Sequence, residues 1–301
     1  MRLNKLSSKD KKLFDKYLGL ERHELSVYAF ANIYIWRKFF DIRWGLIKNR
    51  LCIFFKDNIG SFLYLPALGK SNSPYVINEV FDILDKENAN SEFPHIENIE
   101  EKDLAFYRDL GFDCKLKSYD YVCRRADLAK LTGGKFKSKR ASCNYFTKNY
   151  NYSYRKLKAD DRGDCLKLYD CWMKQRKSGK EDSIYQGMLE DSRVSLIEAF
   201  DNYSGLAFQG QVVEIENKIK GFTFGFKLNP QTFCILYEIT DLSVKGLAQF
   251  IFRVFAEALQ DYKYINVMDD SGLENLKKVK MSYHPKELIP AYIVRKKRTG
   301  G

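Results

Sequence analysis

A glycine between an apolar strand and an apolar helix is the first feature of this sequence that could do chemistry. Tyr237–Gln249 reads YEITDLSVKGLAQ, and Gly246 lies where the strand gives way to the helix. Such a junction leaves successive backbone N–H groups free at the helix N-terminus, which suits an anion such as a pyrophosphate. The segment matches neither GxGxxG nor GxxxxGK[ST], so it does not support a Rossmann or P-loop site. The competing interpretation is that Gly246 is a turn residue.

A second group of reactive side chains follows in Met268–Pro285, MDDSGLENLKKVKMSYHP. Acids in the first turn of a helix and a proline after its last turn are favoured by helix physics alone. His284, beside Tyr283 and Lys280, is nevertheless a candidate for acid/base work, because histidine titrates near neutral pH. A histidine before a proline also serves as a capping or packing residue. The chain has no G-x-S-x-G, so a hydrolase triad is not indicated.

A basic segment with interleaved aromatic residues lies in the middle of the chain. It carries Lys135, Lys137, Lys139, Arg140 and Lys148 together with Phe136, Tyr145 and Phe146. Bases stack on aromatic rings while lysines hold phosphates, as in proteins that bind single-stranded nucleic acid. Helical spacing, however, puts Phe136, Cys143 and Phe146 on one face, and this favours a buried face with a solvated, charged opposite side.

The charge balance points towards partners rich in phosphate. The 301 residues include 51 Lys and Arg against 39 Asp and Glu, a formal net charge of +12. Such an excess favours RNA, coenzyme A or an anionic membrane surface, with which peripheral contact is possible. The alternative is an ordinary lysine-rich, bacterial-type soluble enzyme.

Cysteine, histidine and hydropathy patterns exclude several other classes. The seven cysteines form no CxxC pair and the three histidines are far apart, so we expect neither a disulfide framework nor a metal site. The longest mostly apolar run, Val27–Trp36, is about half as long as a membrane-spanning helix. The start of the chain lacks the apolar core of a signal peptide, so we expect a cytoplasmic protein without a transmembrane segment.

The same order of elements is predicted twice along the chain. In the first half we expect strands in 50–55 and 61–66, a helix in 75–88, a strand in 95–99, a helix in 100–111 and a strand in 117–123. The corresponding elements of the second half are 217–229, 231–241, 247–259, 263–268, 273–281 and 288–296. An offset of about 170 residues indicates a domain duplication. We therefore expect an N-terminal domain in 1–133, a basic connecting helix in 134–150 and a C-terminal domain in 151–301.

Several motifs together resemble a known family. SVYAFANIYIWRKFF, PALG, GGKFKSKRASCNYF, GFTFGFKL, YEITDLSVKG and DDSGLENLKKVKMSYHP occur in this order. The order is similar to that in the C-terminal domain of phosphatidylglycerol lysyltransferase, a domain that also occurs as free-standing proteins. The resemblance implies an α/β (α+β) fold made of tandem GNAT-like domains, with mixed sheets flanked by helices, similar in plan to the Fem aminoacyltransferases.

The resemblance also implies an activity and a site. It implies an acyl- or aminoacyltransferase that uses an aminoacyl-tRNA or acyl-CoA donor as co-substrate, with no tightly bound cofactor and no metal. Glu238 or Asp241 would act as the base, with Lys280 and Tyr283 as the charge-stabilising pair. The donor phosphates would be bound by Ser243, Lys245 and Gly246, and the rest of the cleft would hold Asn266, Asp270, Ser282 and Arg140.

The sequence departs from the family pattern at several polar positions. Asn266–Gly272 reads NVMDDSG where the family usually has Asn-Arg-Glu-Glu-Asp-Leu-Gly, and Tyr237–Asp241 reads YEITD where it has Phe-Glu-Lys-Ala-Asp. The usual Lys-Arg-Asn-His becomes Lys139–Ser142, KRAS. These losses leave open a second function, a catalytically degenerate GNAT-like ligand-binding protein.

The two copies differ at the junction that would bind the donor. In the first copy, LPALGKSNSP carries Pro66 and Pro74, which lack backbone N–H groups. The second copy, TDLSVKGLAQ, keeps every N–H group and adds Lys245 beside them. We therefore expect the second domain to bind the donor phosphates, while the first is mainly structural or shapes the acceptor side.

Overall fold

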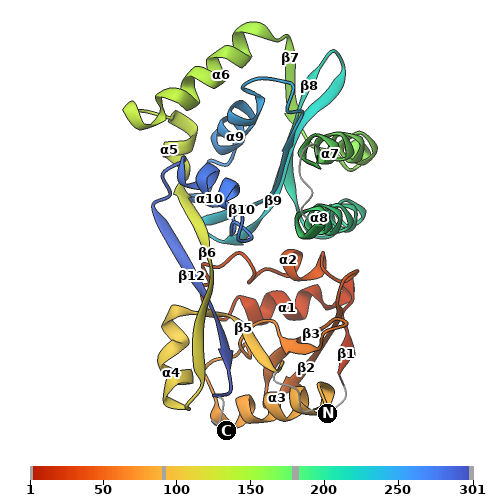
Figure 1. Cartoon of the computed structure of the whole chain (residues 1–301), viewed down its shortest axis with the longest axis vertical. Helices are drawn as coiled ribbons and strands as arrows, with labels where there is room; N and C mark the ends of the chain where they lie inside the picture. Colours follow the sequence, from red (N-terminus) through yellow and green to blue (C-terminus); the bar gives the residue numbers. More distant parts are fainter. Residues whose placement is uncertain (1–2, 90–92, 178–182, 298–301) are drawn as a thin grey trace. The chain divides into compact units, whose positions relative to one another are not determined.

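The computed structural model describes residues 3–89, 93–177 and 183–297, which group into two compact units (Figure 1). Unit 1 consists of Met1–Asp120, Asp269–Gly272 and Leu288–Gly301, and unit 2 consists of Tyr121–Met268 and Leu273–Glu287. The basic segment 134–150 thus belongs to unit 2. The division into 1–133, 134–150 and 151–301 that was expected from the sequence stays a prediction.

Unit 1 is a mixed sheet covered by helices. Its strands are β1 (Asn4–Lys5), β2 (Asp41–Ile47), β3 (Arg50–Lys56), β4 (Ser61–Leu63), β5 (His95–Glu100), the first part of β6 (Asp113–Arg124) and most of β12 (Glu287–Arg295). Its helices are α1 (Lys11–Leu18), α2 (Phe30–Tyr34), α3 (Pro74–Glu87) and α4 (Leu104–Asp109). The strands lie in the order β1-β2-β3-β4-β5-β12-β6. Strands β4 and β5 run parallel, whereas β1–β2, β2–β3, β3–β4 and β5–β12 are antiparallel pairs.

The core of unit 1 lies between this sheet and α3. The apolar face of α3 is Val76, Ile77, Val80, Phe81 and Leu84, all buried against strand residues such as Phe54 and Ile96. These residues recur at helical spacing after Pro74, which occupies the first turn of the helix, so the sequence pattern accounts for this face.

Unit 2 repeats the plan and adds helices. Its strands are β7 (Tyr152–Lys156), β8 (Gln209–Ile215), β9 (Lys218–Asn229), β10 (Thr232–Thr240), β11 (Tyr264–Asn266) and the end of β6. Its helices are α5 (Arg125–Lys130), α6 (Lys137–Asn149), α7 (Arg162–Lys177), α8 (Ser183–Asp201), α9 (Leu247–Ala258) and α10 (Glu274–Met281). The strand order is β6-β11-β10-β9-β8-β7, with β10 and β11 parallel and the other pairs antiparallel. The sequence analysis assigned no element to α7, α8 or β8.

The sheet of unit 2 is covered on both faces. Helices α7 and α8 lie on one side of β8–β10 and α9 lies on the other (Figure 1). Because of this double cover, every residue of β9 from Gly221 to Phe226 is buried. The alternation of Phe222, Phe224 and Phe226 alone would indicate a strand that is buried on one face only. Helix α9 buries Leu247, Phe250, Ile251, Phe252, Phe255 and Ala256 against the sheet.

Local geometry confirms that both halves are built alike. Each has a two-residue hairpin with both residues in the left-handed region, Lys48-Asn49 between β2 and β3 and Glu216-Asn217 between β8 and β9. Two left-handed residues are what a type I′ hairpin requires. The tandem α/β fold class expected from the sequence is confirmed.

The last strand of each half pairs in the other unit. In unit 1, β12 runs antiparallel to β5, with Ala291 opposite Glu100. In unit 2, the end of β6 runs antiparallel to β11, with Cys123 opposite Ile265. Each sheet is therefore completed by a strand from the other half of the sequence.

Candidate active site

The site is built where β10 loses its parallel neighbour. The ladder between β10 and β11 covers only Thr232–Cys234 and Tyr264–Asn266. From Ile235 onward, β10 has no strand partner on this side within the part of the chain that the structure describes. The register with β9 also shifts between Ile235 and Tyr237, a bulge of the kind that re-aims side chains beside functional sites.

Asn266 and Lys280 hold the chain away from β10. The side-chain oxygen of Asn266 accepts the N–H of Met268 at 2.7 Å, and Met268 has a left-handed backbone with φ of +61°. This turn ends β11. The ammonium of Lys280 donates to the carbonyl oxygens of Val267 at 2.6 Å and Met268 at 3.3 Å. Both residues were predicted to belong to the site, and their hydrogen bonds fix the chain where the ladder between β10 and β11 ends.

Glu238 lies on this open part of β10. Burial raises the pKa of its carboxyl group to about 8, while the positive charge of Lys139 lowers it. Within the described residues, the carboxyl group has no hydrogen bond or ion pair. The side chain is half-buried. A carboxyl group that is withdrawn from water without a partner costs free energy, so such groups are often functional.

Lys139 of α6 is next to Glu238 and was not among the residues that the sequence singled out for the site. Its ammonium donates to Ser282 Oγ at 2.7 Å and lies 4.1 Å from the centre of the Tyr283 ring. Burial lowers its pKa, and Glu238 acts in the opposite direction. The spacing of Phe136, Cys143 and Phe146 did mark the buried face of α6, and this face is confirmed. The spacing of these residues could not show that Lys139, at the edge of this face, contacts Ser282, which lies 143 positions further along the chain.

Tyr283 is a buried aromatic residue that packs beside Lys139. Its ring packs edge-on against Phe252 with 4.5 Å between centroids. Its pKa lies well above the usual range, first because of burial and then because of the negative charge of Glu238. The neighbouring His284 has φ of +54° and is exposed, with Nε2 3.3 Å from the carbonyl oxygen of Lys135. The His284 ring packs edge-on against Phe136 with 5.4 Å between centroids, which matches the packing interpretation.

Asp241, the other carboxylate predicted as a base, has a different environment. Its oxygens accept hydrogen bonds from Lys220 Nζ at 2.8 Å, from Ser243 N at 3.0 Å and Oγ at 2.7 Å, and from Gln175 Nε2 at 3.4 Å. Although burial alone would raise the pKa of Asp241, these bonds hold it well below its usual range. Asp241 orders the loop before α9, and its lone pairs are already occupied.

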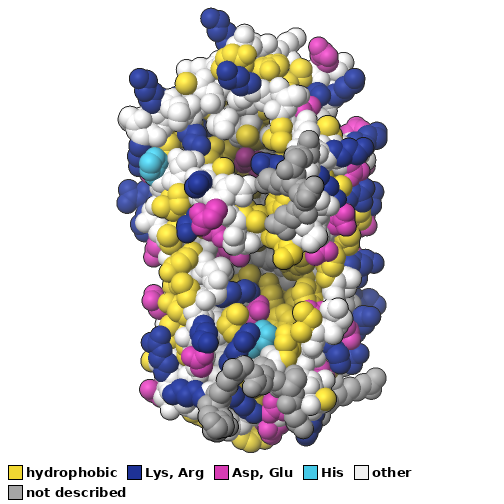
Figure 2. Space-filling view, viewed as in Figure 1, with side chains coloured by type: hydrophobic (Ala, Val, Ile, Leu, Met, Phe, Trp, Pro, Cys, Tyr) yellow, Lys and Arg dark blue, Asp and Glu magenta, His cyan; other side chains and the backbone are white. Residues whose placement is uncertain are grey.

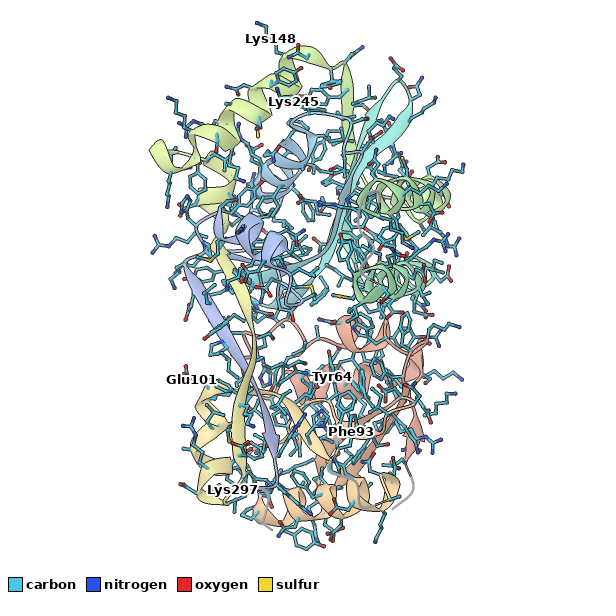
Figure 3. All side chains as sticks on the ribbon, viewed as in Figure 1. Tyr64, Phe93, Glu101, Lys148, Lys245 and Lys297 are labelled. Carbon is cyan, nitrogen blue, oxygen red and sulfur yellow. The ribbon has the colours of Figure 1, made fainter. Side chains whose placement is uncertain are left out.

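The predicted donor-phosphate residues lie in that loop. Ser243 and Lys245 are exposed, and the Lys245 ammonium lies 4.5 Å from the centre of the exposed Tyr145 ring on α6. Lys245 and Lys148 both lie at the end of unit 2 where α6 ends (Figure 3). Gly246 is the residue before α9 and has φ of +86°. A Cβ atom there would lie 2.2 Å from the carbonyl oxygen of Ser142, so the packing of α6 alone already requires glycine.

Three further predicted residues have mainly structural contacts. Ser282 Oγ donates to the carbonyl oxygen of Val279 at 2.6 Å while it accepts from Lys139. Arg140 donates to the carbonyl oxygens of Leu131 and Gly133. Asp270 belongs to unit 1, where its Oδ1 accepts the N–H of Gly272 at 3.0 Å. The cluster around Glu238 is made of residues of unit 2.

Unit 1 has its own cavity at the corresponding junction of the first copy. It measures about 220 Å³ and is lined by the 66–72 loop, Tyr28 and His23, among others. His23 Nδ1 lies 2.9 Å from Glu100 Oε2, and both side chains are buried. Among the described residues there is no group of three or more His, Cys, Asp or Glu that could hold a metal ion.

The fold defines the class of protein. The chain has the tandem mixed α/β fold of GNAT and Fem acyltransferases. Residues 20–295 match the family described as phosphatidylglycerol lysyltransferase, C-terminal, and the chain belongs to this family. The family expected from the motifs is thereby confirmed.

Several solved structures have the same fold. A conserved protein of unknown function from Bacteroides thetaiotaomicron is 26% identical with a TM-score of 0.88, covering 99% of this chain and 100% of that one. L-PGS from Bacillus licheniformis is 16% identical with a TM-score of 0.67 over 97% and 93% of the two chains. FemX is 9% identical with a TM-score of 0.60 over 98% and 96%. No curated protein sequence matches the chain. None of the described helices combines the length and the apolar character needed to span a membrane.

Proposed function

We propose that this protein is an acyl- or aminoacyltransferase whose reaction takes place at Glu238. The observation that carries the proposal is the unpartnered Glu238 carboxyl group on the open edge of β10, beside Lys139 and Tyr283. Acyl transfer to an amine or hydroxyl needs a base within reach of the acceptor and donors for the oxyanion, and often no covalent nucleophile.

Glu238 is the better candidate for the base. A carboxylate whose pKa is about 8 is a much stronger base than an ordinary one, and about a tenth of it is ionised at pH 7. Asp241 is ionised, but its oxygens are already hydrogen-bonded to Lys220 and Ser243. We therefore assign proton removal to Glu238 and loop ordering to Asp241.

The donor would lie along the open edge of β10. Backbone N–H and C=O groups on an unpaired strand edge bind extended chains by adding to the sheet. An aminoacyl-tRNA end or the pantetheine arm of an acyl-CoA would place its carbonyl carbon beside Glu238 in this way. Ser243, Lys245 and the start of α9 would then meet the donor phosphates. The family, named for lysyl transfer, supports an aminoacyl donor, and the net charge of +12 supports a polyanion.

Transfer from labelled donors tests the proposal. The purified chain is incubated with radiolabelled aminoacyl-tRNAs or acyl-CoAs and a set of amine, alcohol and lipid acceptors, and labelled products are separated. We expect transfer from at least one donor, lost in Glu238→Gln and kept in Glu190→Gln, which removes an exposed carboxylate of α8. If no donor is bound or consumed, the proposal is wrong.

The polar residues lost from the family pattern favour one alternative, a ligand-binding protein without turnover. Such a protein would be stabilised against thermal unfolding by a donor while releasing no product. Transfer abolished by Glu238→Gln would exclude it.

A further inference from the structure

Lys139 is a half-buried ammonium without an acidic partner. Within the described residues, its hydrogen-bond acceptor is Ser282 Oγ at 2.7 Å, and no carboxylate lies within 4.0 Å of Nζ. A lysine has three N–H donors, so donors remain after this bond is made. Partial removal of an ammonium from water without a counterion costs free energy, and a negative charge brought to this place would recover it.

The position of this ammonium is fixed by its neighbours. The hydroxyl hydrogen of Ser282 is directed to the carbonyl oxygen of Val279, so the lone pairs of Oγ face Lys139. The Tyr283 ring lies under the ammonium at 4.1 Å, a distance typical of a cation–π contact. A cation held in advance of the reaction stabilises developing charge without the cost of reorganisation.

The two lysines that were predicted for the site are differently engaged. Lys280 donates to two backbone carbonyl oxygens, and Lys245 lies over the exposed ring of Tyr145. The sequence had assigned charge stabilisation to Lys280 with Tyr283. The contacts favour Lys139 with Tyr283 instead.

We propose that Lys139 is the catalytic cation of the transferase, which binds the carbonyl oxygen of the donor as it becomes negative. This inference rests on the proposed function. The acceptor nitrogen or oxygen attacks the donor carbonyl carbon, and the π electrons move to the carbonyl oxygen, which Lys139 Nζ–H stabilises. Glu238 takes the acceptor proton. When the carbonyl re-forms, the bond to the leaving oxygen or sulfur breaks, and Glu238 returns the proton to that atom.

The separation of Lys139 from Glu238 fits these two roles. If they formed an ion pair, the carboxylate would be a weak base and the ammonium would have no vacant donor. They are instead close enough to influence each other and lie beyond 4.0 Å. A reacting carbonyl between them would have its oxygen on the Lys139 side and the attacking atom on the Glu238 side.

Kinetics of three lysine variants test the inference. We expect Lys139→Met to lower kcat by about 100- to 1000-fold with little change in KM, the loss seen when one oxyanion donor is removed. Lys139→Arg should recover part of the rate. Lys137→Met, which removes an exposed lysine of the same helix, should match the wild type. Unchanged kcat in Lys139→Met, or a loss confined to KM, would overturn the inference.

The pH dependence separates catalysis from mere positioning of Glu238. If Lys139 only tuned the carboxyl group, Lys139→Met would regain the full rate at pH values where Glu238 is fully ionised. We expect the deficit to persist there, and full recovery would overturn the inference.

A measurement without turnover keeps this test distinct from that of the proposed function. The carboxyl band of Glu238, identified in infrared difference spectra by its loss in Glu238→Gln, is titrated in the wild type and in Lys139→Met. We expect its titration to move to higher pH in the variant because a nearby positive charge is lost. An unmoved titration would show that Lys139 does not reach the site and would overturn the inference even if transfer occurs. If the Glu238 titration moves to higher pH in Lys139→Met but the protein transfers no acyl group, Lys139 does lie beside Glu238 and the proposed transferase function is wrong.

Discussion

Glu238 and Asp241 are three positions apart in the sequence, yet their environments move their pKa values in opposite directions. Burial without hydrogen bonds raises the pKa of Glu238, whereas Lys220 and Ser243 hold that of Asp241 low. When the environments of two acids move their pKa values in opposite directions, one site can contain both a base and a permanent anion. At the scale of single residues, hydrogen-bond partners decide which acid can do chemistry.

The rate of transfer should follow the ionisation of Glu238. Because the carboxylate is the active form, kcat/KM is expected to rise with pH through an apparent pKa near 8 and then level off. Initial rates between about pH 6 and 9.5 check this. Glu238→Gln should lower kcat/KM by about 100-fold or more and abolish the dependence. A profile with its midpoint near the ordinary carboxyl value of 4.5 would contradict the assignment.

The same residue should make the wild type less stable as pH rises. The folded pKa of about 8 lies above the unfolded value of 4.5, so the folded state binds the proton more tightly. Stability from this group is complete below the unfolded value and is lost as pH rises through 8. Glutamine cannot ionise, so Glu238→Gln is expected to raise Tm relative to the wild type above pH 7. The Tm difference, measured between about pH 5 and 9, should grow with pH. A constant difference would speak against a buried ionisable group.

Glu100 in unit 1 should behave in the opposite way. Its pKa is lowered despite burial, because His23, Lys102 and the backbone N–H of Glu24 bind its carboxylate. This stability is present above the unfolded pKa and is lost as pH falls through the folded one. Glu100→Gln should therefore lower the free energy of unfolding at pH 7 by on the order of 1–3 kcal/mol.

Urea unfolding at pH 7 and at pH 4 measures this effect. The difference between the wild type and Glu100→Gln should narrow at the lower pH. The exposed neighbour Glu101, changed to Gln, is the matched control and should alter stability little. Equal losses in both variants would contradict the assignment.

At the scale of elements, α6 packs against the start of α9, next to the loop 241–246 that is predicted to bind the donor phosphates and is called the donor loop below. Gly246 combines φ of +86° with a position where a Cβ would meet the carbonyl oxygen of Ser142 at 2.2 Å. Helix α6 also supplies Lys139 to the site and Tyr145 to Lys245. Displacement of α6 would therefore disturb both the base and the loop.

Gly246→Ala should be destabilising by at least about 1–3 kcal/mol, since a left-handed backbone and a steric clash add. Gly163→Ala in α7 is the control, because a Cβ there meets nothing within 4 Å. In a helix this change is neutral or stabilising. Chemical denaturation of both variants measures the difference. Equal stability of the two variants would show that α6 does not press on Gly246.

The tightness of this junction also changes how the donor loop is best tested. A larger residue at Gly246 would damage packing whether or not an anion binds there. Lys245→Ala removes a charge from an exposed position, so a loss of donor affinity in this variant can be assigned to the loop itself. Ser243→Ala would also break the hydrogen bond from Ser243 Oγ to Asp241, so it does not separate donor binding from loop order.

At the scale of the whole molecule, the charge of +12 is spread over many surface lysines and arginines, as the visible face shows (Figure 2). Such a surface binds a polyanion through several phosphates at once, and each contact releases counterions. Salt sensitivity therefore reports how many phosphates the donor brings.

Binding of aminoacyl-tRNA should weaken by about 10-fold or more between about 50 and 200 mM salt, whereas acyl-CoA binding should weaken much less. Titrations of both donors by fluorescence anisotropy at several salt concentrations give the two slopes. Equal, shallow slopes would indicate that tRNA makes no more phosphate contacts than coenzyme A does.

The sequence by itself determined the elements and their repetition. The alternating Phe222, Phe224 and Phe226, the apolar helix that begins at Pro74 and the glycine before α9 all depend on residues close together in the chain. The repeat with its offset of about 170 residues and the family motifs can also be found in the sequence alone. The family resemblance also placed Glu238 and Tyr283 in one site, and this stays a prediction.

Only the tertiary structure decided which of the candidates meet. In the folded chain, the end of β6 pairs with β11 and β12 pairs with β5. Lys139 of α6 contacts Ser282, while Asp241 and Lys280 form hydrogen bonds with Lys220 and with the carbonyl oxygen of Val267. The physical reason is the distance along the chain between the interacting residues. Helix and strand patterns arise from hydrogen bonds and burial between near neighbours, whereas a pKa or an ion's partner depends on side chains that folding brings together from distant parts of the chain.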